Sequence, residues 1–232
     1  LYHDQDIVIE GEEKEKVELL LDLLTPVAKS YPSEMGIISV SQGLQILGGY
    51  GYCDEFPLEQ YYRDVRIHPI HEGTTGIHGI TLLGRNVPMK KGKAFACFTA
   101  EIRKVIGEAE KLPETSPLAK KLEEALVTLE KVSAFLMKQA GGDPDIFLAD
   151  ATLYLEAFGI VTIAWQWLIQ AIAAAKGLGG ATLEDETHFY QGKLFTARYF
   201  FSYELPKIEG LVRRLYENDG LTVAMKETYF VD

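Results

Sequence analysis

Cysteine is nearly absent from this chain. Its 232 residues include two cysteines, Cys53 and Cys97, which show no paired spacing. Closely spaced pairs are typical of disulfide-stapled secreted domains and of zinc sites, so the sequence predicts two reduced thiols instead. The opening stretch, LYHDQDIVIEGEEKEK, is acidic where a secretory signal would be basic. Both features lead us to expect a cytoplasmic protein.

Positive charge is also scarce. The chain has 23 Lys and Arg residues against 34 Asp and Glu residues, and its formal net charge is −11. Such a surface repels polyanions, which argues against nucleic acid and anionic membranes as partners. Small anionic ligands remain compatible, because a local basic side chain or a helix N-terminus binds phosphate on an acidic protein too.

A strand pattern is missing as well, because no segment alternates apolar and polar residues in a convincing way. One apolar stretch, Ala157 to Ala175, has no charge and approaches the length of a membrane span. Gln166, Gln170 and Thr162 interrupt it, and it continues a helical pattern that begins far upstream. We therefore predict a buried helix of a bundle and no membrane span.

The remaining pattern is helical from the start. The first segment has an apolar face formed by Val17, Leu20, Leu21 and Leu24. Pro26 and Pro32 are expected to kink this helix or divide it from the next, because proline lacks the N–H that a helix needs. Ser33 is expected to cap the second helix, and the glycines of residues 48–51 to end it.

Shorter helices are predicted next. One begins at Pro57, since proline suits the first turn, and ends before Pro69. Another is expected from about Thr74 to Asn86, with a break near Gly92.

The second half is predicted to contain four longer helices. Two of them begin at Ser116 and Asp143, each followed by a proline suited to the first helical turn. The helices are expected to cover residues 91–111, 116–141, 143–177 and 184–218, the last with a kink at Pro206.

Long helices with short connections predict an all-α protein. We expect residues 1–90 to form an incomplete helical bundle and residues 91–232 to form a second, antiparallel helical bundle. The first part has few substantial helices for a core of its own. It is therefore expected to pack against missing chain, the second part or a partner subunit.

The stretch RIHPIHEGTTGIHGI, residues 66–80, allows three interpretations. A metal site would use the three histidines and Glu72, but Pro69 keeps His68 and His71 off a common helical face and no H-E-x-x-H spacing is present. No metal site is predicted. A helix cap needs only Thr74, after a turn at Gly73, and periodicity alone favours it. The third interpretation makes Glu72 a catalytic base.

Three motifs in residues 43–86 bear on this choice: QILGGYGY, RDVRI and HEGT, in this order. Together they resemble the carboxy-terminal domain of flavin-dependent acyl-CoA dehydrogenases. The upstream LLTPVAKSY and the long helical tail after LLGR resemble an extended subgroup, typified by 3-methylmercaptopropionyl-CoA dehydrogenase. The resemblance implies that the chain is the carboxy-terminal part of a longer subunit.

The resemblance also implies a reaction, the α,β-dehydrogenation of an acyl-CoA thioester to an enoyl-CoA. Glu72 matches the family's catalytic base, which removes the proton next to the thioester carbonyl. Flavin adenine dinucleotide (FAD) is the implied cofactor, and an electron-transfer flavoprotein is the implied oxidant. Cofactor contacts, partly with the FAD of a neighbouring subunit, are implied for Gln45, Gly48, Gly49, Gly73 and Thr74.

Some features depart from the family. His71 stands where a tyrosine is usual, which removes a ring from the expected acyl pocket, and His78 replaces a glutamine. An amino-terminal helical domain and a middle β domain, which the family needs to hold FAD, are missing from the sequence. We therefore expect the complete subunit to bind FAD and to form a homodimer. We expect this segment alone to be inactive. The alternative is a non-catalytic helical interaction or dimerisation module.

Overall fold

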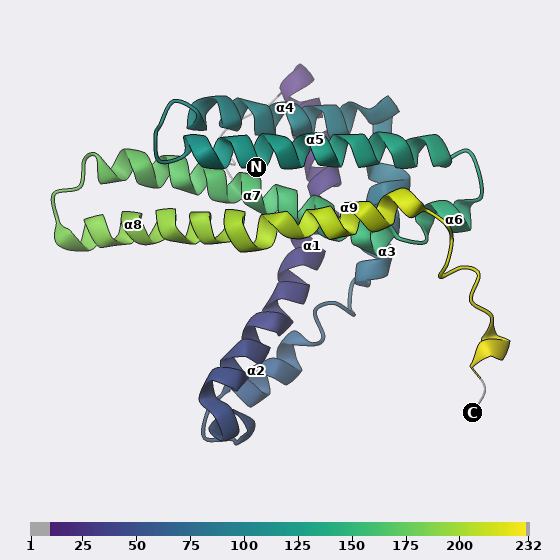
Figure 1. The fold of residues 1–232 in the computed structure, drawn as a ribbon, viewed down its shortest axis with the longest axis horizontal. Coiled ribbons are helices and arrows are strands. Elements are labelled where there is room, and N and C mark those ends of the chain that lie inside the picture. The colour runs from purple at the N-terminus through teal and green to yellow at the C-terminus, as the bar shows by residue number, and fades with distance from the viewer. Residues whose placement is uncertain (1–9, 231–232) are drawn as a thin grey trace.

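The structure is a computed structural model that describes residues 10–230, and within this range it consists of helices and turns without a β-strand. The second half forms an antiparallel bundle (Figure 1). Its rods are α4 (Met89–Ala109), α5 (Ser116–Gln139), α7 (Ala151–Leu178), and α8 (Glu184–Tyr199) continued by α9 (Ile208–Glu217). The predicted all-α fold, with an antiparallel bundle in the second half, is confirmed.

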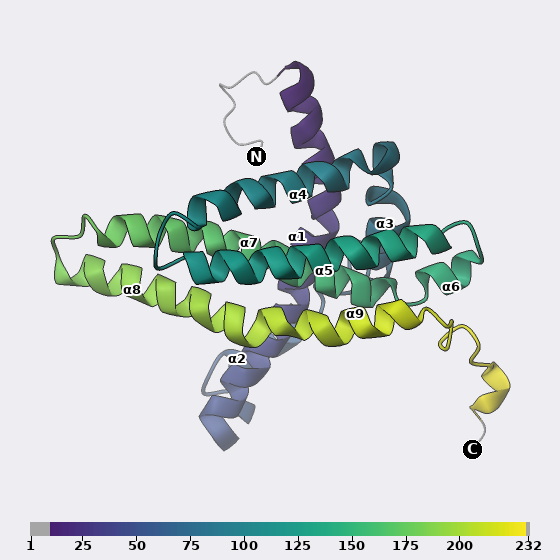
Figure 2. The same ribbon diagram turned by 45° about the horizontal axis from the view of Figure 1, so that its top comes forward.

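The longest helix, α1 (Gly11–Leu47), crosses this bundle and emerges on both sides of it (Figure 2). The predicted division at Pro26 and Pro32 is wrong, because α1 continues through both prolines. The predicted cap at Ser33 is wrong too, since its hydroxyl donates a hydrogen bond to the carbonyl of Lys29 one turn earlier. Tertiary contacts have overridden the local preference against proline.

One of these contacts replaces a bond that proline removes. Pro26 has no N–H, so the carbonyl of Asp22 loses its ordinary helical partner. The side-chain amide of Asn86, buried at 6% exposure, donates to that carbonyl at 2.7 Å. A residue 64 positions away thus satisfies the acceptor and lets α1 continue.

We expect Asn86→Ala to lower the free energy of unfolding by about 1–3 kcal/mol, because it removes the donor that pairs the Asp22 carbonyl and empties a buried position. Urea denaturation followed by circular dichroism measures the change. In a Pro26→Ala background the restored N–H of residue 26 can bond to the Asp22 carbonyl. Asn86→Ala should then lower the free energy of unfolding by clearly less. Equal losses in both backgrounds would contradict this role of Asn86.

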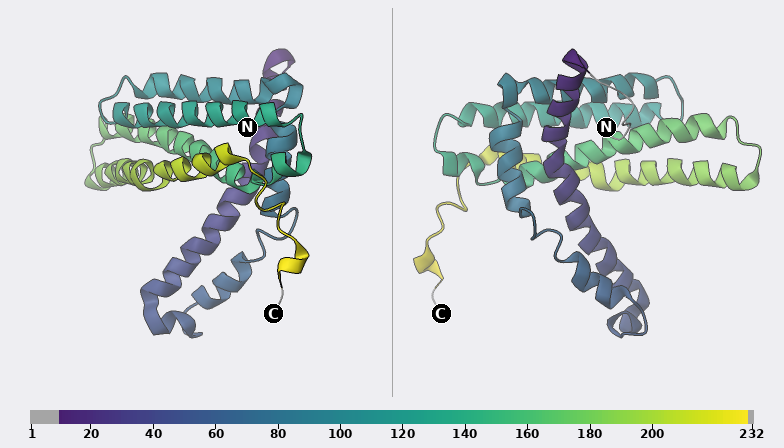
Figure 3. Two further views of the ribbon diagram at one scale, coloured as in Figure 1. Left: turned by 45° about the vertical axis from the view of Figure 1, so that its right-hand side comes forward. Right: turned by 180° about the vertical axis from the view of Figure 1, so that it is seen from behind.

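The carboxy-terminal half of α1 leaves the bundle as an arm, and α2 (Leu58–Val65) folds back along it (Figure 3). None of the residues of α2 is buried. The tip is apolar and open, with Ile46 at 83% and Tyr52 at 92% exposure. After the arm, the chain returns to the bundle through a non-helical segment and enters α3 (Thr75–Thr81), which continues as a π-helical turn, Leu82–Asn86.

The start of α4 is irregular, as the predicted break near Gly92 indicated. Lys90, Lys91 and Gly92 have φ angles of 49°, 60° and 83°, in the left-handed region. Glu15 of α1 accepts hydrogen bonds from Lys90 at 2.7 Å and from Lys93 at 2.6 Å. These bonds lower the pKa of the Glu15 carboxyl to about 2, and they tie this unusual turn to α1.

The helix predicted for residues 143–177 is wrong as a single rod. It consists of α6 (Pro144–Leu148) and α7, separated by a turn at residues 149–150. Asp150 leaves the helical conformation there, and its carboxylate accepts a hydrogen bond from Arg214 of α9 at 3.1 Å. The stretch Pro144–Leu178 is apolar and long enough to span a membrane, and 56% of its most apolar window is buried inside the protein.

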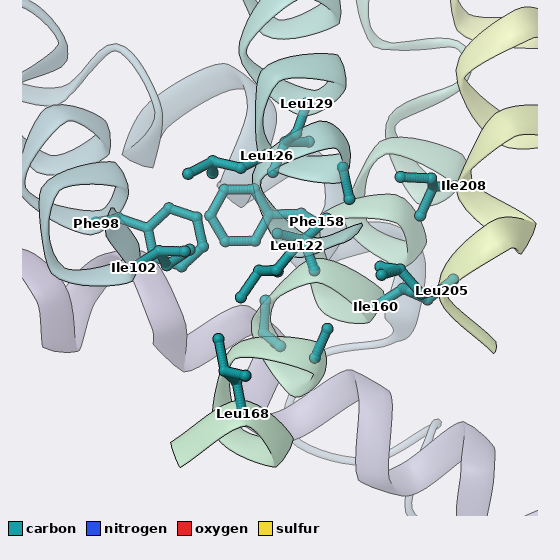
Figure 4. Close-up of a cluster of buried hydrophobic side chains, with 14 of the residues drawn as sticks. Phe98, Ile102, Leu122, Leu126, Leu129, Phe158, Ile160, Leu168, Leu205 and Ile208 are labelled. Carbon is teal, nitrogen blue, oxygen red and sulfur yellow. The ribbon is translucent and has the colours of Figure 1, made fainter. Parts of the chain in front are cut away.

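The core of the bundle lies around α7. Phe158 stacks on Phe98 with ring centroids 4.6 Å apart, and leucines of α5 pack around the pair (Figure 4). Leu23 of α1 and Leu82 of the π-helical turn belong to the same cluster. The first part of the chain therefore packs against the second. The boundary between residues 1–90 and 91–232 stays a prediction.

Candidate active site

Glu72 lies in a tight turn just before α3. Its φ angle is 54° and that of Gly73 is 95°, so two successive residues adopt left-handed conformations. A side chain other than glycine pays about 1–2 kcal/mol for this conformation, so the turn needs support from its surroundings. Glycine suits this position because side chains rarely adopt a φ angle of 95°, and a Cβ atom there would also lie 2.9 Å from Nε2 of His78.

Two side chains of α1 hold this turn. The ammonium of Lys29 donates a hydrogen bond to the Gly73 carbonyl at 2.5 Å. The hydroxyl of Thr75 donates to the carboxylate of Glu34, one and a half turns further along α1. Because α1 is anchored in the core, these bonds fix Glu72 relative to the whole bundle.

The local cap of α3 is made by Thr74, as predicted. Its hydroxyl accepts a hydrogen bond from the backbone N–H of Ile77 at 3.4 Å. A ring nitrogen of His78 lies 3.3 Å from the Glu72 carbonyl and closes the turn from the other side. In residues 10–230 the Glu72 carboxylate makes no hydrogen bond or ion pair within the chain. The capping interpretation therefore accounts for Thr74 and leaves the Glu72 side chain available.

The turn borders a depression of about 280 Å³ between α1 and the α3 segment. Glu72, His78, Arg85 and Met89 line it from the turn and the segment that follows, and Pro26 is among the lining residues of α1. The Glu72 side chain is exposed. An exposed carboxylate on a turn held by a helix can accept a proton from a molecule placed against it.

The other predicted site residues lie elsewhere. Gln45, Gly48 and Gly49 are exposed at the tip of the arm, where Gly48 ends α1 with a φ angle of 59°. The helix between Lys29, which contacts the Glu72 turn, and Gln45 is about 24 Å long at about 1.5 Å per residue. The structure thus brings Glu72, Gly73 and Thr74 together and keeps the arm residues apart from them within one chain.

The tip leaves room for a ligand. A Cβ atom added at Gly48 or Gly49 would meet nothing within 4 Å, so bare backbone faces open space there. Glycine backbone without a side chain allows a ligand to approach closely, and the N–H of Gly48 itself donates to the Gln45 carbonyl. Among the residues that the structure describes, no group of three or more His, Cys, Asp or Glu side chains could hold a metal ion.

Gly79 determines how α3 sits on the bundle. A Cβ atom there would lie 2.7 Å from the carbonyl oxygen of Ala151 at the start of α7. We expect Gly79→Ala to lower the free energy of unfolding by about 1–3 kcal/mol, because the helices must move apart. Thermal melts check this. Gly192→Ala, at an open helical position, should instead stabilise the protein by about 0.5–1 kcal/mol.

Two family models match consecutive parts of the chain. Residues 8–86, which contain the Glu72 turn, match the model described as "Acyl-CoA dehydrogenase, C-terminal domain". Residues 98–226 match the model described as "Acetyl-CoA dehydrogenase C-terminal like", which alone covers more than half of the chain. The chain belongs to the acyl-CoA dehydrogenase family. It represents a carboxy-terminal part, which confirms the resemblance of its motifs.

Known acyl-CoA dehydrogenases agree with this placement. The chain is 33% identical over 198 residues to 3-methylmercaptopropionyl-CoA dehydrogenase of Ruegeria pomeroyi, a match that covers 84% of the chain and 33% of that enzyme. It is 29% identical over 205 residues to the broad-specificity linear acyl-CoA dehydrogenase of Mycobacterium tuberculosis, over 86% of the chain and 34% of that enzyme. The chain thus spans about a third of the length of these relatives.

The fold is also shared with a solved structure. An acyl-CoA dehydrogenase from Bacillus anthracis, determined in complex with FAD, superimposes with a TM-score of 0.65 and 19% sequence identity. The match covers 89% of this chain and 34% of that one. At this level of identity the match shows that the two segments share a fold.

Sequence reasoning missed the residues of α1 that support the turn. Lys29 and Glu34 lie 44 and 41 positions from their partners, Gly73 and Thr75. No motif spacing indicates such pairs, because a lysine and a glutamate on an amphipathic helix are ordinarily solvated side chains.

Proposed function

We propose that this chain is the carboxy-terminal part of a flavin-dependent enzyme that converts an acyl-CoA thioester to the enoyl-CoA, with Glu72 as the catalytic base. The observation that supports this role is the unpartnered, exposed carboxylate of Glu72 on a turn fixed by α1. A base must be held within hydrogen-bond reach of the proton it removes, and an anchored turn meets that requirement.

In this proposal the chain contributes two functions. Glu72 accepts the proton from the carbon next to the thioester carbonyl. At the arm tip, Gln45, Gly48 and Gly49 would hold FAD, while Gly73 and Thr74 would contact its adenosine part. When bound, FAD supplies the acceptor for the hydride that leaves the β carbon. Because the arm and the Glu72 turn are about 24 Å apart along α1, their cofactor contacts are best explained by two subunits of a homodimer.

The complete protein would contain amino-terminal and middle domains, act in the cytoplasm and pass its electrons to an electron-transfer flavoprotein. The length of the relatives supports the missing domains, since this chain covers about a third of them. The exposed apolar side chains of the arm support a large contact surface, as Ile46 and Tyr52 are 83% and 92% exposed.

The same exposed arm also favours the alternative, a helical interaction module without catalysis. Anaerobic mixing of the full-length protein with acyl-CoA thioesters of several chain lengths distinguishes the two. The enzyme should lose the visible absorbance of its flavin as substrate reduces it. A protein that purifies without flavin, or whose flavin stays oxidised with every thioester, would exclude the proposed activity.

A further inference from the structure

We propose that Lys29 is a positioning residue that holds the Glu72 turn in the geometry needed for proton abstraction, an inference that rests on the proposed role of Glu72. Its ammonium donates a hydrogen bond to the carbonyl of Gly73, the residue directly after Glu72. The side chain of Lys29 is half-buried between α1 and this turn.

The turn requires such an anchor because its own backbone disfavours the conformation it adopts. Glu72 is a non-glycine residue with a φ angle of 54°, next to Gly73 at 95°. A glutamate in the left-handed region returns to an extended or helical conformation when nothing opposes it. Such strain persists where the surroundings overdetermine the backbone, and it is concentrated at functional sites.

The bond from Lys29 is suited to oppose this change. It joins a charged donor to a carbonyl oxygen, and charge-assisted hydrogen bonds are roughly twice as strong as neutral ones. The part of α1 that carries Lys29 is rigid, because Leu23 and Val27 of the preceding turns are buried in the core. The Gly73 carbonyl belongs to the peptide that joins Gly73 to Thr74, so a change in the backbone dihedral angles of Gly73 moves it away from the ammonium.

A second tie, from Thr75 to Glu34, lies on the helical side of the turn. It fixes the first residue of α3 and lies beyond the two left-handed residues. Lys29 is therefore a residue of α1 that bonds directly to one of the two left-handed residues, Gly73, next to the strained Glu72. Loss of this hydrogen bond should leave α3 in place. It should let the backbone of the Glu72 turn relax, so that the carboxylate loses its fixed position.

The test compares Lys29→Met with Lys29→Arg in the full-length flavoprotein. Methionine keeps most of the aliphatic stem and removes the donor, whereas arginine keeps a charged donor. We expect Lys29→Met to slow flavin reduction by acyl-CoA at least about tenfold, because small misplacements of a catalytic group cost up to about a hundredfold. Thioester affinity, flavin content and melting temperature should change little, and Lys29→Arg should restore most of the rate.

Lys104→Met, at an exposed position of α4, is the matched control and should reduce its flavin at the wild-type rate. A rate for Lys29→Met equal to this control would overturn the positioning role. So would a loss of rate that follows only from lower flavin content or a lower melting temperature, because that result assigns Lys29 a structural role.

A double-variant cycle separates this inference from the proposed function. If Lys29 acts through Glu72, then Lys29→Met should add no further loss to Glu72→Gln, since residues that act as a unit are non-additive. Multiplicative losses would overturn the positioning role and leave Glu72 as the base. A wild-type rate for Glu72→Gln alone would overturn the proposed base itself, and with it the role of Lys29.

Discussion

Glu72→Gln in the full-length enzyme should slow flavin reduction by acyl-CoA by at least about two orders of magnitude, the usual scale for loss of a general base. Glutamine keeps the size of the side chain and can occupy the same turn, but it cannot take up the proton. Stopped-flow absorbance of the flavin measures the rate. Acyl-CoA affinity and melting temperature should stay close to those of the wild type, because Thr74, not the Glu72 carboxylate, caps α3.

Glu110→Gln provides a matched control. It makes the same chemical change on an exposed residue just after α4, about 30 Å along that helix from the depression at Met89. This variant should reduce its flavin at the wild-type rate. The capping interpretation of Glu72 predicts the reverse pattern for Glu72→Gln, a preserved rate with a stability loss of about 0.5–1 kcal/mol. That result would remove Glu72 from the chemistry.

Phe158→Ala should have the largest effect on stability, a loss of about 3–5 kcal/mol in the free energy of unfolding. The ring is fully buried and stacks on Phe98, and the rings of Phe95 and Tyr154 lie within 6.2 Å of it. Removing it loses the apolar burial and leaves a cavity between α4, α5 and α7 that rigid helices fill only in part. Urea denaturation followed by tryptophan fluorescence measures the change, since Trp165 lies 5.9 Å from Phe98.

The control makes the same substitution on the surface. Phe195 of α8 is 67% exposed, so Phe195→Ala should change the free energy of unfolding by no more than about 0.5 kcal/mol. If Phe158→Ala cost less than about 1 kcal/mol, the aromatic cluster around α7 would not be the centre of the core.

Periodicity predicted most helices because their apolar faces are encoded locally. The helix of residues 116–141 appears as α5, and Leu122, Leu126 and Leu129 are buried as their spacing indicates. Where the predictions were wrong, a distant residue had intervened. Asn86 lets α1 continue past Pro26, and Arg214 holds the turn at Asp150 that ends α6.

The candidate site shows the same contrast. Gly73 and Thr74 could be predicted from the sequence, because a glycine turn followed by a capping threonine is a local signal, and the structure bears out both the turn and the cap. The availability of the Glu72 carboxylate could not be predicted, because it depends on what the rest of the chain leaves unpaired. Whether Glu72 acts as a base stays a prediction.

The sequence by itself determined the all-α fold, the family and the position of the capped turn, because apolar spacing, capping residues and short motifs act over a few residues of chain. Only the tertiary structure decided that α1 runs unbroken, that the Gln45 arm lies away from Glu72, and that Lys29 and Glu34 hold the turn. The unbroken α1 and the supported turn depend on hydrogen bonds between residues 41 to 64 positions apart. Such bonds form only after packing has brought the helices together, so local patterns do not reveal them.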